Sequence, residues 1–199
     1  MGTRHLICIF YKGQFIVIQY GQWDGYLDGQ GKEILHFIQV EENLQRLTAG
    51  LAHIYSPTSE DIKAINAELD ADKEKNNSST TARFSVFDTP LNRLYPSLSR
   101  DTGAKILEVI AKASPEKRVP IQKDTDFIGD GSCEWVYVVD LDQRVFEVYE
   151  GNVDKASQPG NRFMDFVKTG KYIPNLVNSF SLNALPATDE EFYAAMETE

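Results

Sequence analysis

The stretch LICIFYKGQFIVI, from Leu6 to Ile18, decides the fold of this chain. Two apolar runs, Leu6–Phe10 and Phe15–Ile18, flank Lys12-Gly13, a pair that suits a two-residue hairpin turn. Because successive positions in both runs are apolar, both faces of each strand are expected to be covered. The sequence therefore predicts a central hairpin buried within the molecule.

The register of this hairpin follows from its turn. Counting outward gives the expected cross-strand pairs, which are Phe10 with Phe15, Cys8 with Val17, Leu6 with Gln19, Arg4 with Gly21 and Thr3 with Gln22. The two faces of the hairpin are then expected to carry Ile7, Ile9, Ile16 and Ile18 on one side and Cys8, Phe10, Phe15 and Val17 on the other. This pairing brings the amino terminus beside the loop Gly21–Tyr26, where we expect Arg4 and Asp24 to form a salt bridge.

A second hairpin is expected at Trp135–Val139 and Val145–Tyr149, with Leu176–Leu182 as an edge strand. Helices are predicted between the hairpins and at the end of the chain, over 34–38, 40–54 and 58–69, from Thr89, over 99–110 and from Thr188. The order of strands, helices, strands and helix predicts an α+β fold, with a mainly antiparallel sheet built on the two hairpins and packed with helices. We expect a single domain over 1–199, with a mobile polar insertion at Asp70–Ala82.

The composition of the chain argues against some classes of binding partner and some cellular compartments. The 199 residues carry a net charge of −10, which disfavours nucleic acids and anionic membranes. The longest apolar runs fall far short of the roughly 20 residues that span a bilayer, and Leu6–Phe10 is too short for a signal peptide. Cys8 and Cys133 are the only cysteines, so no disulfide framework is expected, and we predict a cytoplasmic protein.

Three segments of the chain have distinctive motifs. They are GTRHL (2–6) with QYGQWDGY (19–26), LSRDTGA (98–104) and CEWVYVVDLD (133–142). Together they resemble a family of fungal and bacterial proteins over most of the chain. The resemblance implies one continuous domain and brings no particular reaction with it.

Thr3 is a candidate nucleophile. The hairpin that begins there resembles the opening of amino-terminal-nucleophile hydrolases, in which the first residue attacks an amide with its own α-amino group as base. Under this hypothesis Arg4, Gln22 and Asp24 orient the substrate or stabilise an oxyanion. The mechanism requires removal of Met1 and Gly2, and the alternative is that Thr3 and Arg4 simply begin a strand.

Cys133 offers a second catalytic hypothesis, with His5, His36 or His53 as its base. Acidic neighbours raise the pKa of a thiol, which argues against this pairing, and Cys8 in mid-strand is expected to be an inert core residue. The carboxylate pairs of the chain fit ordinary turns, and no spacing indicates a zinc or calcium site. We therefore predict no metal and no cofactor.

The polar and aromatic residues around the first loop are the remaining candidate. Aromatic rings with neighbouring amides supply flat apolar area and directional hydrogen bonds, which a pocket for a small molecule or peptide requires. The ligand-binding residues predicted for this pocket are Arg4, Gln19, Gln22, Trp23, Asp24 and Tyr26. The alternative is that Trp23 only plugs the end of the sheet. The sequence thus predicts a binding or regulatory domain, with an amide hydrolase as the alternative.

Overall fold

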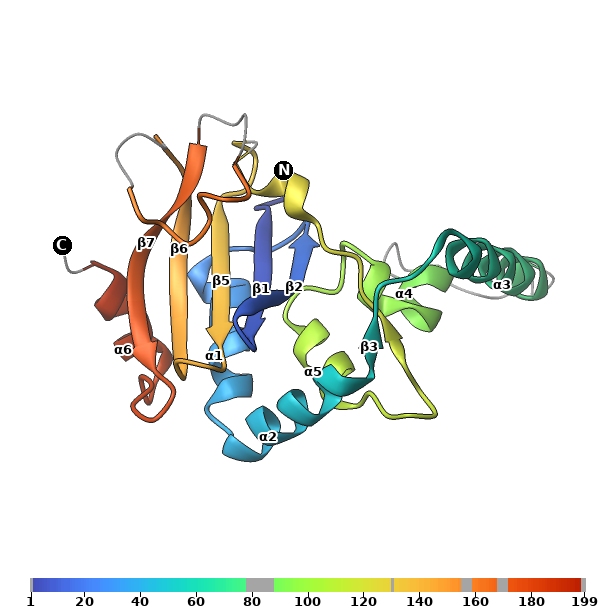
Figure 1. Ribbon diagram of the computed structural model, residues 1–199, viewed down its shortest axis with the longest axis horizontal. Coiled ribbons are helices and arrows are strands. Elements are labelled where there is room, and N and C mark those ends of the chain that lie inside the picture. Colours follow the sequence, from blue (N-terminus) through green and yellow to red (C-terminus); the bar gives the residue numbers. More distant parts are fainter. Residues whose placement is uncertain (1, 78–87, 130, 155–158, 168–171, 198–199) are drawn as a thin grey trace.

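The computed structural model describes residues 2–77, 88–129, 131–154, 159–167 and 172–197. Its centre is a five-stranded sheet in the order β2-β1-β5-β6-β7 (Figure 1). The strands of this sheet are β1 (His5–Tyr11), β2 (Gln14–Gly21), β5 (Trp135–Asp140), β6 (Val145–Asp154) and β7 (Tyr172–Ser181). Strands β3 (Ile54–Tyr55) and β4 (Val119–Pro120) form a small second sheet.

The two predicted hairpins lie side by side in the main sheet, and β7 forms one edge. They meet through β1 and β5, which run parallel, whereas the other three neighbouring pairs are antiparallel. A parallel pair needs a long crossover, and the helical segment between β2 and β5 supplies it. The predicted α+β class with a mainly antiparallel sheet is confirmed.

The turn of the first hairpin is where the sequence predicted it, but the register beyond it is different. Lys12 and Gly13 both have positive φ, at 52° and 74°, as a tight hairpin turn requires, and Phe10 lies opposite Phe15. A β-bulge then leaves Ile16 without a cross-strand partner, so that Ile9 faces Val17.

The bulge makes the outer part of the predicted register wrong. The observed pairs beyond it are Cys8 with Ile18, Ile7 with Gln19, Leu6 with Tyr20 and His5 with Gly21. The predicted faces change accordingly, because Val17 joins Ile7 and Ile9 on one side whereas Ile18 joins Cys8 and Phe15 on the other. A shift of one residue exchanges the faces of every position that follows.

The described part of the crossover contains five α-helices. They are α1 (Lys32–Ile38), α2 (Glu41–Gly50), α3 (Ser59–Asn77), α4 (Pro90–Leu94) and α5 (Lys105–Ala111), and α6 (Asp189–Glu197) follows β7. Single turns of helix occupy Leu27–Gly31, Leu51–His53, Pro96–Leu98 and Thr125–Phe127. The helix predicted over 40–54 is α-helical only to Gly50, and the helix predicted from Ser99 begins at Lys105.

The capping signals of the sequence hold at three helices. Thr58 Oγ1 accepts a hydrogen bond from the Asp61 backbone N–H at 3.2 Å, and Asp61 Oδ2 accepts one from the Thr58 backbone N–H at 2.8 Å. Thr89 Oγ1 accepts from the Asn92 backbone N–H at 3.1 Å at α4, and Thr188 Oγ1 accepts from the Glu191 backbone N–H at 3.2 Å before α6. Residues 70–77 of the predicted insertion continue α3, which projects away from the sheet (Figure 1), and 78–82 lie outside the described residues.

The sheet has a core on each face. Helices α1, α2, α5 and α6 cover the face that carries Ile7, Ile9, Tyr137 and Val139. Segments around Ile128 and Phe163 cover the face that carries Leu6, Cys8, Val136 and Val138. None of the helices in the described parts of the chain is long and apolar enough to cross a membrane.

Candidate functional site

Three segments distant in sequence meet at one end of the helix-covered face, and we call their meeting point the corner. They are 2–5, 19–31 and 97–104. The Gly25 backbone N–H donates to the Thr3 carbonyl at 3.1 Å, and the Gln22 backbone N–H donates to the Arg100 carbonyl at 2.9 Å. Backbone groups of all three segments are thus hydrogen-bonded to one another, which fixes their relative positions.

Trp23 lies at the centre of the corner. Its indole N–H donates to Asp101 Oδ1 at 2.9 Å, and the other oxygen of Asp101 accepts from Asn92 Nδ2 at 3.3 Å. A Cβ atom at Gly2 would lie 2.4 Å from the Trp23 ring, so the backbone of Gly2 packs directly against it. Trp23 nevertheless remains 39% exposed. It is therefore held firmly in place while part of its surface stays open to solvent.

His5 is buried beneath the corner at 1% exposure, between two glycines. A Cβ at Gly21 would lie 2.2 Å from the His5 ring, and one at Gly25 would lie 2.9 Å from Nδ1. Neither ring nitrogen makes a hydrogen bond with the described residues. Burial lowers the pKa of His5 to about 4, against a smaller opposing effect of the Thr3 carbonyl, so the ring is neutral near pH 7.

A cavity of about 920 Å³ opens beside Trp23. Its lining comes from the loop before α1, from α1 itself and from the segment that leads into α5. The lining residues are Trp23, Asp24, Tyr26, Asp28, Gly29, Gln30, Glu33, His36, Phe37, Arg100, Asp101, Thr102, Gly103, Ala104, Lys105 and Glu108. The volume lies within the range of small-molecule sites, roughly 300–1,000 Å³.

The two walls of the cavity are joined at its base. The Ala104 backbone N–H donates to Gln30 Oε1 at 2.6 Å, and the Gln30 backbone N–H donates to the Asp24 carbonyl at 2.8 Å. Gly103, with a φ of +54°, leaves space that the Gln30 amide occupies, because a Cβ there would lie 2.2 Å from Oε1. The conformation of this loop also explains why α5 begins only after it.

Of the residues predicted to bind ligand, Trp23, Asp24 and Tyr26 line the cavity. Gln19 and Gln22 are not among the lining residues. Gln19 is 3% exposed and donates to the Ser99 carbonyl at 3.2 Å, while Gln22 Oε1 accepts from the Tyr20 hydroxyl at 2.9 Å. The Gln19 side chain therefore holds the segment 97–104, whereas the Gln22 side chain contacts Tyr20, a residue of the core on the opposite face of the sheet.

Thr3 and Arg4 are not among the residues that line the cavity. Thr3 is 5% exposed. The predicted salt bridge between Arg4 and Asp24 is wrong, since neither residue forms an ion pair within the described chain. The bulge sets His5 rather than Arg4 opposite Gly21, and the backbone of Arg4 is instead hydrogen-bonded to Glu134.

Several of the residues that line the cavity were not predicted from the sequence. Asp28, Glu33 and Phe37 come from α1 and the turn before it, Arg100 comes from the loop before α5, and Lys105 is the first residue of α5. The motif LSRDTGA at 98–104 was a usable signal, because an irregular polar segment before an apolar helix is typical of a loop with a specific contact. Its contact with the first loop could not be inferred without the tertiary structure.

The cysteine hypothesis has no geometric support from His5 or His36. Cys133 is 4% exposed and packs in the core of the opposite face from His5. His36 Nε2 lies 2.7 Å from Asp189 on α6. Among the described residues, no group of three or more His, Cys, Asp or Glu side chains is arranged to hold a metal ion.

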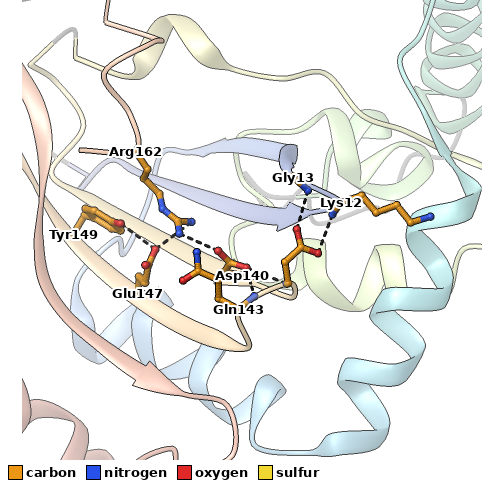
Figure 2. Close-up of polar contacts among 8 residues, drawn as sticks. Lys12, Gly13, Asp140, Gln143, Glu147, Tyr149 and Arg162 are labelled. Atoms are coloured by element: carbon orange, nitrogen blue, oxygen red, sulfur yellow. Dashed lines mark hydrogen bonds and ion pairs between the residues drawn. The ribbon is translucent and has the colours of Figure 1, made fainter. Parts of the chain in front are cut away.

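A second polar cluster lies on the other face of the sheet, around Arg162 (Figure 2). Arg162 Nη2 lies 2.9 Å from Asp140 Oδ2, and Nη1 lies 3.2 Å from Glu147 Oε2, which also accepts from the Tyr149 hydroxyl at 2.9 Å. Burial raises the pKa of the Glu147 carboxyl, and the charge of Arg162 opposes that shift. These residues are not among those that line the cavity beside Trp23, and we interpret the cluster as a structural lock.

Comparisons with known proteins found no match: no family model, no curated protein and no solved structure is significantly similar to this chain.

Proposed function

We propose that this chain is a binding domain that holds a small molecule or short peptide in the cavity at the corner. The observation that carries the proposal is the cavity of about 920 Å³ with Trp23 and Tyr26 in its wall. Tyr26 is 53% exposed and Trp23 is 39% exposed. Exposed aromatic rings in a concave site supply much of the contact area in ligand recognition.

The rigidity of the walls supports the proposal. Gln30, Asp101 and Gln19 each form a hydrogen bond that joins the first loop or β2 to the segment 99–104. A pocket that is already formed loses less conformational entropy when a ligand binds. If Trp23 only covered the end of the apolar core, its ring would not need to remain exposed.

The alternative, an amide hydrolase with Thr3 as nucleophile, remains a prediction. It requires loss of Met1 and Gly2, which the intact mass of the purified protein would reveal. Loss of Gly2 would also remove the backbone that packs against Trp23. This hypothesis therefore predicts that trimming changes the environment of the Trp23 indole.

Binding can be measured directly at Trp23. The chain has two tryptophans, so a ¹⁵N-labelled sample gives two indole signals, and a Trp135→Phe variant assigns them. We expect a library of uncharged, cationic, anionic and zwitterionic small molecules and tripeptides to contain compounds that shift the Trp23 signal in a saturable way.

The matched variants separate the pocket from the rest of the surface. Tyr26→Ala should weaken these compounds at least fivefold, whereas Leu94→Ala, at a residue that is 43% exposed outside the cavity, should leave them unchanged. A library in which no compound shifts the Trp23 signal contradicts the proposal.

A further inference from the structure

The charged side chains that line the cavity fall into two groups: engaged ones, which already contact a partner within the protein, and unengaged ones, which form no ion pair with the described residues. Glu108 is engaged, because it lies 3.3 Å from Arg46 and 3.0 Å from Lys112. Asp101 is engaged by Trp23 and Asn92, and His36 is engaged by Asp189. These groups already have partners within the protein, so they contribute less to a ligand.

Five charged groups of the lining form no ion pair with the described residues. The carboxylates among them are Asp24, Asp28 and Glu33, and the cations are Arg100 and Lys105. The negative and the positive charges lie on different segments of the chain. The carboxylates lie on 24–33, and the cations lie on 100–105 across the base formed by Gln30 and Ala104.

We propose that the pocket takes a small zwitterion, a molecule that bears an ammonium group and a carboxylate group on an apolar body, as amino acids and short peptides do. This inference rests on the proposed function above. The wall at 24–33 would take the ammonium group, the wall at 100–105 would take the carboxylate, and Trp23, Tyr26 and Phe37 would contact the apolar body.

The net charge of the protein gives a competing expectation against which this inference can be tested. A chain of net charge −10 attracts any cation, and long-range attraction alone would favour a pure cation over a zwitterion. A preference for the zwitterion therefore requires local cations, which in this cavity are Arg100 and Lys105. The critical comparison is between a ligand with a free carboxylate and the same ligand with an amide.

The probes are four forms of alanyl-phenylalanine: the free dipeptide, its N-acetyl form, its C-terminal amide, and the form blocked at both ends. Their bodies are nearly alike, while their charges change from zwitterion to anion, cation and neutral. We expect the free dipeptide to bind at least fivefold more tightly than either singly blocked form, as measured by the shift of the Trp23 indole signal. Free phenylalanine, tested in parallel, shows whether the amino acid or the dipeptide is the better fit.

Two variants assign each charge to a wall. Lys105→Gln should reduce the preference for the acid over the amide, and Asp28→Asn should reduce the preference for the free amine over the acetylated form. The controls Lys63→Gln and Glu74→Gln change exposed residues of α3, which lie outside this cavity, and they should leave both ratios within twofold.

The possible results distinguish this inference from the proposed function. An amide that binds as tightly as the free dipeptide, or ratios that Lys105→Gln and Asp28→Asn do not change, would overturn the zwitterion inference. If none of the five compounds shifts the Trp23 signal but other library compounds do, the inference fails and the pocket remains. If neither the probes nor the library compounds shift the Trp23 signal, both the zwitterion inference and the proposed function are overturned.

Discussion

His5 illustrates how a single residue can make the stability of a fold depend on pH. Its ring fills the space that the missing side chains of Gly21 and Gly25 leave, and it has no hydrogen-bond partner among the described residues. A neutral imidazole can tolerate such a site, whereas an imidazolium ion would be buried without a counterion. Protonation of His5 therefore destabilises the corner.

We predict that His5 makes stability depend on pH. Its pKa is lowered from 6.5 to about 4 in the folded state, so the unfolded chain binds a proton first as the pH falls. The stabilisation is complete above pH 6.5 and is lost progressively towards pH 4, by about 3 kcal/mol in total. Chemical denaturation at several pH values should show this loss in the natural chain.

One variant isolates the contribution of His5 from that of the carboxylates. His5→Leu should flatten the curve between pH 6.5 and pH 4. An unchanged slope in His5→Leu would mean that the ring is protonated in the folded state without cost.

We also predict that Gly21 and His5 are coupled. Gly21→Ala places a Cβ 2.2 Å from the His5 ring, and this overpacking should destabilise the protein by about 2 kcal/mol. Combining it with His5→Ser makes room for the new methyl group, so the double variant should be more stable than the sum of the single effects predicts. A double-mutant cycle measured by urea denaturation would refute the contact if the two effects added within about 0.3 kcal/mol.

At the scale of elements, periodicity and capping signals predicted most of the strands and helices. The turn at Lys12-Gly13, the cap at Thr58 and the second hairpin were correct because each depends on residues close in sequence. The bulge at Ile16 was not predicted, since it depends on how the side chains of β1 and β2 pack against two separate cores. That one unpaired residue changed which side chains reach the corner.

The segment after β6 is fastened to the sheet by Arg162, and we predict that this contact is strongly stabilising. Arg162→Met would leave Asp140, which has a fully buried side chain, without its ion-pair partner, and would leave Glu147 without its own. Removing one partner of a buried ion pair costs about 3 kcal/mol, which lowers the melting temperature by about 10 °C in a domain of this size.

Arg93 is the matched control for Arg162. It also bridges two carboxylates, Asp72 and Asp88, but its side chain is 40% exposed. Exposed pairs contribute about 1 kcal/mol or less, so Arg93→Met should change the melting temperature only slightly. Equal effects of the two variants would mean that the cluster in Figure 2 is not a structural lock.

At the scale of the whole molecule, the sequence located the corner but not its cavity. The first loop was predicted from its aromatic and amide residues, and Trp23, Asp24 and Tyr26 do line the cavity. The opposite wall, 100–105, lies more than 70 residues later in the chain, and no local pattern reports which loop it contacts. Contacts between distant loops depend on the packing of the helices that carry them.

The burial of the sheet on both faces leads to a last prediction. Ile9 and Val139 are neighbours on β1 and β5, and both are 0% exposed. Ile9→Asp or Val139→Asp would bury a carboxylate with no counterion among its apolar neighbours, and we expect either variant to abolish soluble expression. Leu176→Asp makes the same chemical change on the edge strand β7, where the side chain is 45% exposed, and this variant should remain soluble with an unchanged far-UV spectrum. Ile9→Val removes only one methyl group and should cost about 1 kcal/mol, which separates loss of volume from burial of charge. Soluble, cooperatively folding Ile9→Asp protein would show that β1 is not covered by the helices, and the cavity built on that packing would then lose its supporting wall.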